Sequence, residues 1–305
     1  MTQKNKYPVK MLPYLKETVW GGSKLEKYYG KERHDLSNIA ESWELSAIKG
    51  MESYSYDKKS FDEIFKEFNS FADCPVLIKF IDSESDLSIQ VHPSEKDGNA
   101  LPKNECWYIL SADKDSKIAY GFKSSVAKSD IDESISNGTV CNALNYVNVK
   151  PGDFFYVPAG LVHAIGKGIT LLEIQQSSDT TYRIFDYNRT DKNGRPRELH
   201  IEKAKSAIKH FSSKEINDLC FSRPDDQDGI LCACKYFSVF KITSEKNLSK
   251  AISNKNSSLT FLTDGSFTLD GRSFEGYAGD TFYIPPGDGK TDLIISAEEA
   301  VLTVF

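Results

Sequence analysis

Two segments of the chain share one pattern, and this internal repeat limits the possible folds more than any other feature of the sequence. Residues 149–165 read "VKPGDFFYVPAGLVHAI", and residues 276–293 read "GYAGDTFYIPPGDGKTDL". In both, Gly-Asp precedes a short aromatic run that ends at Pro-x-Gly, where proline and glycine favour a turn. A repeat about 127 residues apart predicts two similar β units. Only the first copy carries a histidine, His163 three residues after Gly160, and Lys290 takes the corresponding place in the second.

The segments around these repeats predict a mainly β fold. Six segments rich in β-branched and aromatic residues indicate strands, at residues 76–82, 105–110, 116–122, 153–158, 169–176 and 181–187. Three segments have helical periodicity instead, at residues 60–68, 127–136 and 200–211. Ser60 precedes an acidic first turn and is expected to cap its helix. We therefore expect two β domains with a few flanking helices.

A polar stretch after the last predicted helix, residues 213–229, marks the expected domain boundary. The first domain is expected to cover residues 1–213 and to carry the helices as insertions. The second is expected to cover residues 214–305. Because its copy of the repeat has no histidine, we expect the second domain to lack metal ligands.

Composition narrows the class of protein. The chain has 305 residues and a formal net charge of −6, which gives no support to nucleic acid as a partner. It contains no apolar run of about 18 residues, so we expect no membrane association, and its start has no signal-peptide pattern. A cytoplasmic location is therefore expected. The six scattered cysteines indicate free thiols. The sequence leaves monomer and dimer open.

A candidate metal site lies in and near "LSIQVHP", residues 87–93. Gln90 and His92 project from the same face of a strand, because side chains alternate along it. With His163 and Glu105, which opens another predicted strand, they offer one amide, two imidazoles and one carboxylate. This set suits Zn²⁺ with one position open for water or substrate. The alternative is that His92 caps a turn and His163 is a hydrogen-bonded core histidine; spacing alone does not decide.

A second group of polar residues occupies residues 171–189, "LLEIQQSSDTTYRIFDYNR". Arg183 lies in a half-apolar strand, where an arginine is costly unless it meets an anion. A phosphorylated substrate is such an anion, and an internal ion pair with Asp179 or Glu173 is the alternative. Lys103, two residues before the candidate ligand Glu105, is either a substrate contact or a surface lysine.

Several motifs together resemble a known family. The segment "GDFFYVPAGLVHAI" resembles the second cupin motif, and "QVHP…E" resembles a first cupin motif with Gln in place of a His. The ordered set "VWGG", "ESWELS", "LSIQVHP", "KNECWYIL", "VPAGLVHAIGKG" and "EIQQSSDTTYRIFDYNR" resembles type I phosphomannose isomerase in its short bacterial form. These motifs cover roughly residues 10 to 205. The resemblance implies two cupin-type jelly-roll β-barrels, the second without metal.

The resemblance also implies a site and a reaction. It implies one Zn²⁺ per chain, held by Gln90, His92, Glu105 and His163. It implies catalytic roles for Lys103, Glu173, Asp179 and Arg183, and substrate contacts by Ser88, Lys103 and Arg183. The family interconverts mannose 6-phosphate and fructose 6-phosphate through a cis-enediol intermediate, so the expected partner is a small phosphosugar. The base stays open among Glu173, Lys103 and a zinc-bound water. The phosphate contacts of larger members come from a helical domain for which this chain has little room, so they are not carried over.

Three other functions compete with this one. A non-catalytic sugar-binding or regulatory cupin would keep the fold but lack the set of charged residues around the metal. A cupin oxygenase would use iron or copper, which a metal analysis separates from zinc. An isomerase of a different phosphosugar is the nearest enzymatic alternative, and an assay with glucose 6-phosphate discriminates it.

Overall fold

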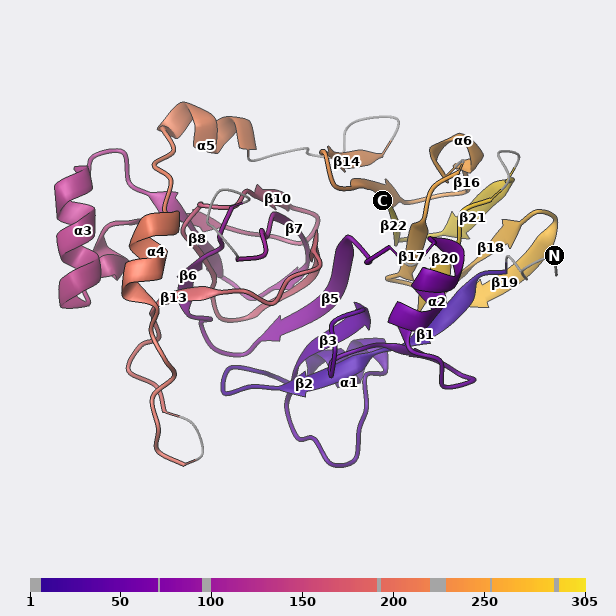
Figure 1. Ribbon diagram of the computed structural model, residues 1–305, viewed down its shortest axis with the longest axis horizontal. Coiled ribbons are helices and arrows are strands. Elements are labelled where there is room, and N and C mark those ends of the chain that lie inside the picture. Colours follow the sequence, from indigo (N-terminus) through magenta and orange to yellow (C-terminus); the bar gives the residue numbers. More distant parts are fainter. Residues whose placement is uncertain are drawn as a thin grey trace. The chain divides into compact units, whose positions relative to one another are not determined.

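A computed structural model describes residues 7–70, 72–94, 100–190, 193–219, 229–252, 254–287 and 291–305. Within these residues the protein is mainly β, with four sheets of seven, six, five and four strands and short helices between them (Figure 1). None of the four sheets closes on itself in this part of the chain. The mainly β prediction is confirmed, and the two jelly-roll barrels stay a prediction.

The first strands are β1 (Val9–Leu12), β2 (Tyr14–Glu17), β3 (Ile39–Leu45), β4 (Tyr54–Ser55), β5 (Val76–Ser83), β6 (Ile89–Val91), β7 (Glu105–Ala112) and β8 (Lys117–Phe122). The next are β9 (Leu144–Asn148), β10 (Phe154–Val157), β11 (His163–Ile165), β12 (Ile169–Gln176) and β13 (Tyr182–Phe185). The last are β14 (Ile230–Ala233), β15 (Ser238–Ile242), β16 (Lys246–Asn247), β17 (Ser257–Phe261), β18 (Gly265–Leu269), β19 (Arg272–Gly276), β20 (Thr281–Ile284), β21 (Leu293–Ala297) and β22 (Ala300–Val304). The helices are α1 (Lys24–Tyr29), α2 (Phe61–Phe68), α3 (Lys128–Asn137), η1 (Val140–Asn142, a 3-10 turn), α4 (Ile201–Ala207), α5 (Ser213–Leu219) and α6 (Ser249–Ile252).

The predicted elements are confirmed with small shifts at their ends. The six predicted strands correspond to β5, β7, β8, β10, β12 and β13, and the three predicted helices to α2, α3 and α4. Ser60 caps α2: its side chain accepts from the backbone N–H of Glu63, and the Glu63 side chain accepts from the Ser60 backbone. This reciprocal capping box satisfies two donors that the first turn leaves open. The short helices α1, α5 and α6 were missed, because few apolar residues mark them.

Contacts divide the chain into two compact units. Unit 1 comprises residues 1–16, 23–80 and 222–305, and unit 2 comprises residues 17–22 and 81–221. Residues 23–80 therefore group with the C-terminal strands, whereas the sequence-based division placed them in the first domain. The division at residue 213 stays a prediction about domains.

Unit 2 contains two groups of strands that carry the candidate site. One is a five-stranded sheet in the order β13-β6-β11-β8-β9, and the other contains the order β10-β7-β12. Apolar side chains on one face of the five-stranded sheet pack against α3 and α4, and in Figure 1 α4 lies beside β6 and β13 with α3 next to α4. On β6 these are Ile89 and Val91. Because strand side chains alternate, Gln90 points to the opposite face of the same sheet.

Unit 1 contains a seven-stranded sheet in the order β14-β15-β22-β17-β20-β1-β4 and a four-stranded sheet in the order β16-β21-β18-β19. The second copy of the repeat runs from the last residue of β19 through β20 to the first residue of β21, and Lys290 lies outside the described residues. A core of buried apolar residues from both sheets, including Leu259, Phe261, Phe267 and Ile295, accounts for the stability of this unit. No cluster of metal-ligating side chains was found in the described residues of unit 1.

Two further expectations concern cysteines and membranes. None of the five cysteines in the described part of the chain forms a disulfide with another of them, as predicted; they are Cys74, Cys106, Cys141, Cys232 and Cys234. Among the described residues, none of the helices combines the length and the apolar character that a membrane span requires.

A buried charge cluster in unit 1 gives the protein an acid-sensitive element. Glu41 of β3 accepts a hydrogen bond from Trp43 Nε1 at 2.7 Å and lies 3.2 Å from Lys16 Nζ and 3.5 Å from Lys79 Nζ. Burial alone raises the pKa of Glu41, but the charges of Lys79 and Lys16 outweigh it and lower that pKa to about 2. The carboxylate is therefore more acidic in the folded chain than in the unfolded chain, whose value is 4.5.

We expect Glu41 to contribute stability that is present above pH 4.5 and is lost as the pH falls toward 2, by about 3 kcal/mol at most. The Glu41→Gln variant should show a lower free energy of unfolding at pH 7, because it leaves Lys79 with one charge partner fewer. Its stability should also fall less between pH 5 and pH 3 than that of the wild type. Urea unfolding followed by circular dichroism measures both. The exposed Glu32→Gln is the matched control, and parallel pH curves for wild type and Glu41→Gln would contradict the assignment.

Candidate metal centre and active site

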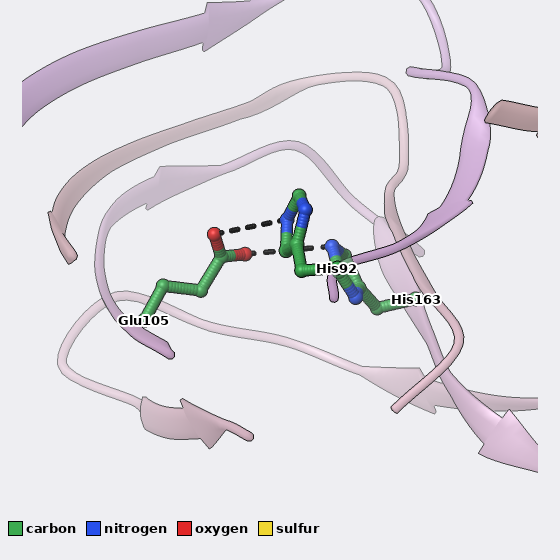
Figure 2. Close-up of side chains that lie close together, drawn as sticks. All are labelled: His92, Glu105 and His163. Carbon is green, nitrogen blue, oxygen red and sulfur yellow. Dashed lines mark ion pairs between the residues drawn. The ribbon is translucent and has the colours of Figure 1, made fainter. Parts of the chain in front are cut away.

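Three buried side chains meet at one point in unit 2. The ligating atoms of His92, Glu105 and His163 all lie within 4.8 Å of one another, and Figure 2 shows the two imidazoles directed at the two carboxylate oxygens. His92 Nε2 is 3.2 Å from Glu105 Oε2, and His163 Nε2 is 3.4 Å from Glu105 Oε1. The structure therefore brings together three of the four predicted ligands.

Strand pairing places these residues. His163 on β11 is the direct antiparallel partner of Gln90 on β6, and the Gln90 amide lies 3.3 Å from His163 Nε2. The two carboxamide positions of a glutamine exchange by a half-turn of the amide, so Gln90 is placed to offer an oxygen at the group. Glu105 opens β7, opposite Gln175 of β12. All four predicted ligands thus lie at one place, with Gln90 at its edge.

Backbone carbonyls orient both imidazoles. His92 Nδ1 is 3.0 Å from the carbonyl oxygen of Thr180, and His163 Nδ1 is 2.9 Å from that of Leu161. A carbonyl only accepts, so each Nδ1 carries the proton and each Nε2 presents a lone pair to Glu105. Metal-bound histidines commonly donate their second N–H in this way.

The protonation states of His92, Glu105 and His163 give this group several hydrogen-bond acceptors and few hydrogen-bond donors. Burial, assisted by the charge of Lys103, lowers the pKa of His92 to about 3, and burial lowers the pKa of His163. Burial favours the neutral form of Glu105, but the charge of Lys103, whose Nζ lies 2.8 Å away, holds the pKa of this carboxyl well below its usual value. Both imidazoles are therefore neutral while the carboxylate is charged.

This arrangement fits a divalent cation. Within the described residues, His92 Nε2 and both oxygens of Glu105 are buried without a partner in hydrogen-bond geometry, and the Lys103 ammonium is an ion-pair contact. Lone pairs that face one another in a dry interior repel unless a proton or a cation lies between them. The proton is excluded by the low pKa of His92. Two neutral imidazoles and one carboxylate are ordinary zinc ligands.

A second acidic side chain lies beside the centre. Trp107 Nε1 donates to Glu173 Oε2 at 2.9 Å, and the two residues are direct partners across β7 and β12. Lys103 Nζ is 2.8 Å from Glu105 Oε2 and 3.9 Å from Glu173 Oε1, so one buried ammonium lies between two carboxylates. The sequence left open whether Lys103 is a surface residue; at 4% exposure it is buried.

Comparison with known proteins identifies the family. The chain is 35% identical over 308 residues to mannose-6-phosphate isomerase ManA of Bacillus subtilis, covering 94% of this chain and 95% of that relative. The chain belongs to the mannose-6-phosphate isomerase family. A crystal structure of the Bacillus subtilis mannose 6-phosphate isomerase matches it with a TM-score of 0.83 at 30% identity, covering 98% of this chain and 99% of that chain. None of the protein-family models compared with the chain matches it.

A more distant member of the mannose-6-phosphate isomerase family has been solved with metal. The structure of a mannose 6-phosphate isomerase bound with zinc and yttrium matches with a TM-score of 0.72 at 14% identity, covering 97% of this chain and 99% of that chain. At this identity the likeness shows the fold alone.

The structure places the other predicted site residues in different surroundings near the candidate metal centre. Arg183 on β13 is the direct partner of Gln90 on β6, and its Nη1 donates to the Glu198 carbonyl at 2.8 Å. Ser88 is buried, and its hydroxyl donates to Gln90 Oε1 at 3.4 Å. Asp179 is exposed in the loop between β12 and β13. Its catalytic role stays a prediction, and its exposure gives that role no support.

Sequence reasoning missed two features of the candidate site. The first is Trp107, whose alternation with Glu105 in "ECWYIL" put both on one face and could have indicated it. The second is the "SSDTT" turn, which presents the Thr180 carbonyl to His92. Gln175 Nε2 fixes that turn by donating to the carbonyl oxygens of Gln176 at 2.8 Å and Ser178 at 2.6 Å. No local pattern shows that a loop carbonyl will orient a ligand 88 residues away.

Proposed function

We propose that this chain is a zinc-dependent aldose–ketose isomerase that interconverts mannose 6-phosphate and fructose 6-phosphate. The single observation that carries the proposal is the buried group of His92, Glu105 and His163, whose lone pairs face one another. Membership of the mannose-6-phosphate isomerase family supplies the reaction and the substrate. A relative with the same fold is described as bound with zinc, which supports the choice of metal.

The proposed zinc ligands are Gln90, His92, Glu105 and His163, with one ion per chain. When bound there, Zn²⁺ supplies Lewis-acid stabilisation of negative charge on the sugar oxygens, worth several kcal/mol in a dry site. The donor set includes one charged carboxylate and two neutral imidazoles, so the ion keeps a net positive charge of one toward the substrate.

Glu173 is the proposed base. It would take the C2 proton of the open-chain aldose, and the electron pair of that C–H bond becomes the C1–C2 double bond of a cis-enediolate with charge on O1. A proton then moves from O2 to O1, and Glu173 returns its proton to C1 to give the ketose. Trp107 Nε1 holds the carboxylate of Glu173 in one orientation, as a base near its target requires.

Lys103 and Arg183 are the proposed cationic partners of the reaction. Lys103 lies within 4 Å of both Glu105 and Glu173, so its ammonium is placed to stabilise charge on the oxygens or to move a proton between O1 and O2. Arg183 extends from β13 on the side of Gln90 and is proposed to contact the negatively charged substrate. Ser88 is proposed to contact substrate beside Gln90.

The domain organisation, the partner and the cellular location of this activity are also proposed. We propose two cupin-type barrels, a metal-binding domain at residues 1–213 and a metal-free domain at residues 214–305. A phosphosugar is the proposed partner and the cytoplasm the proposed location. Monomer and dimer are equally compatible with the proposal.

We expect chelation to abolish activity reversibly. A coupled assay that converts mannose 6-phosphate to fructose 6-phosphate should lose its signal after treatment with a chelator and recover with one equivalent of Zn²⁺, because the enediolate charge then regains its stabilisation. Circular dichroism before and after chelation separates loss of metal from loss of fold. A folded, zinc-loaded protein that converts no mannose 6-phosphate would overturn the proposal. Glucose 6-phosphate in the same assay then tests a different phosphosugar isomerase.

A further inference from the structure

A cluster of arginines surrounds one buried carboxylate in unit 2. Arg189 Nη2 donates to Asp186 Oδ1 at 2.6 Å, and Arg197 donates to both oxygens, through Nε to Oδ2 at 2.7 Å and through Nη2 to Oδ1. Asp186 is 4% exposed, and the pKa of this carboxyl is low because the hydrogen bonds and charges of Arg197 and Arg189 outweigh its burial. The carboxylate therefore fixes two guanidinium groups in one orientation.

The cluster adjoins the proposed active site through β13. Asp186 follows directly after β13, whose Arg183 pairs with Gln90 of β6. Directly paired strand residues project to the same face with Cβ atoms about 5 Å apart, so Arg183 extends on the side of the metal centre. Arg183 Nη1 donates to the carbonyl oxygen of Glu198, the residue that follows Arg197, so the Arg183 guanidinium lies beside the backbone that carries Arg197.

Two of the three arginines keep donors for a ligand. Arg183 uses Nη1 for the Glu198 carbonyl, and its Nε is buried without a hydrogen-bond partner. Arg197 holds Asp186 through Nε and Nη2, so its Nη1 points outside that pair. Arg189 uses all three of its guanidinium nitrogens within the protein. Its Nε donates to the Asp186 carbonyl, its Nη1 to the Asp86 carbonyl and its Nη2 to the Asp186 carboxylate.

The charge balance of the cluster favours an anion. Arg189 and Arg197 contact the single Asp186 carboxylate, and Arg183 adds a third guanidinium nearby, so the cluster has an excess of two positive charges. The next acid is Glu198, whose side chain is 82% exposed and lies 3.8 Å from His200. Asp86 offers its backbone carbonyl to Arg189, and its carboxylate accepts from the backbone N–H of Lys167. Planar guanidinium groups with fixed orientation bind phosphate oxygens in pairs.

We propose that Arg183 and Arg197 bind the phosphate group of the sugar phosphate, with Asp186 and Arg189 holding Arg197 in place. This inference deepens the proposed function and rests on it for the identity of the ligand. The free edges of Arg183 and Arg197 take the phosphate oxygens, while the sugar end reaches the metal centre past Gln90. The proposed phosphate subsite thus consists of Arg183 in β13 and of Arg197, which Asp186 and Arg189 support.

Calorimetric titration of the zinc-loaded protein tests the subsite without requiring turnover. Fructose 6-phosphate and inorganic phosphate are the two probes, and Arg197→Gln is the variant. We expect both dissociation constants to rise by about tenfold or more, which is the loss of one charge-assisted pair. Arg195→Gln is the matched control, because it removes the same charge from an exposed position two residues away, and less than about twofold change is expected there.

Each outcome decides the inference. Unchanged binding of both probes to Arg197→Gln overturns it, and loss of inorganic phosphate with unchanged fructose 6-phosphate overturns the substrate assignment. If Arg197→Gln fails to fold, phenylglyoxal labelling of the wild type decides instead. Inorganic phosphate should then protect Arg183 and Arg197 but not Arg195, and equal labelling rates contradict the subsite. A protein that shows the expected binding loss but no isomerisation refutes the proposed reaction and keeps the subsite.

Discussion

His163→Ala is expected to remove bound zinc and catalytic turnover together. The wild type should bind one Zn²⁺ per chain, and the variant should bind little, because it loses one of two neutral imidazoles directed at Glu105. Loss of a Lewis acid worth several kcal/mol lowers kcat by about a thousandfold or more. Elemental analysis and the coupled mannose 6-phosphate assay on the same preparation measure both quantities.

This experiment distinguishes a His163 that binds metal from a His163 that only packs in the core. His163 is buried, so alanine leaves a cavity and lowers the melting temperature under either interpretation. Zinc content does not depend on the cavity, and it is therefore the deciding readout. The exposed His34→Ala should keep both zinc and activity. A folded His163→Ala that retains one zinc per chain would show that the ligand set is wrong.

The candidate metal centre could be predicted from the sequence to the extent that it depends on alternation along strands. In "SIQVHP", period two puts Ser88, Gln90 and His92 on one face of β6, and apolar Ile89 and Val91 on the face that packs against helices. The same rule applies to Glu105 in β7. The local backbone alone fixes the direction of these side chains, so the assignment of a strand was enough to predict which face each side chain lies on.

Register across strands could not be predicted in the same way. That His163 pairs with Gln90, or that Trp107 pairs with Glu173, depends on which strands become neighbours, and no local pattern fixes this. The resemblance to phosphomannose isomerases supplied the partnership of Gln90, His92, Glu105 and His163 that spacing left open. Contacts outside the recognised motifs, such as the hydrogen bonds from Arg197 to the Asp186 carboxylate, could not be predicted from the sequence.

Asp179 and Arg183 show the limits of assigning roles by order along a motif. Both follow Glu173 in one continuous segment, and both were expected in the site. The turn after β12 leaves Asp179 exposed, while β13 returns Arg183 to the side of Gln90. A loop residue that matches a family position need not share the environment of its neighbours, because the loop direction is set by contacts such as those of Gln175 with Ser178.

Glu173→Gln is expected to lower kcat by about 10²- to 10⁴-fold, with KM and zinc content close to those of the wild type, because it removes the proposed base and keeps the shape. The glutamine carbonyl can still accept from Trp107 Nε1, so the orientation of the side chain is preserved. Exchange of the C2 proton of mannose 6-phosphate with D₂O, followed by NMR, measures the proton-abstraction step directly and should be lost in parallel.

Lys103→Gln is the matched comparison: as a charge-stabilising residue it should slow exchange and conversion while leaving Glu173 able to exchange the proton slowly. If Glu173→Gln exchanges at the wild-type rate and Lys103→Gln does not exchange, the base is Lys103, since its ammonium lies 3.9 Å from the Glu173 carboxylate and within the same site.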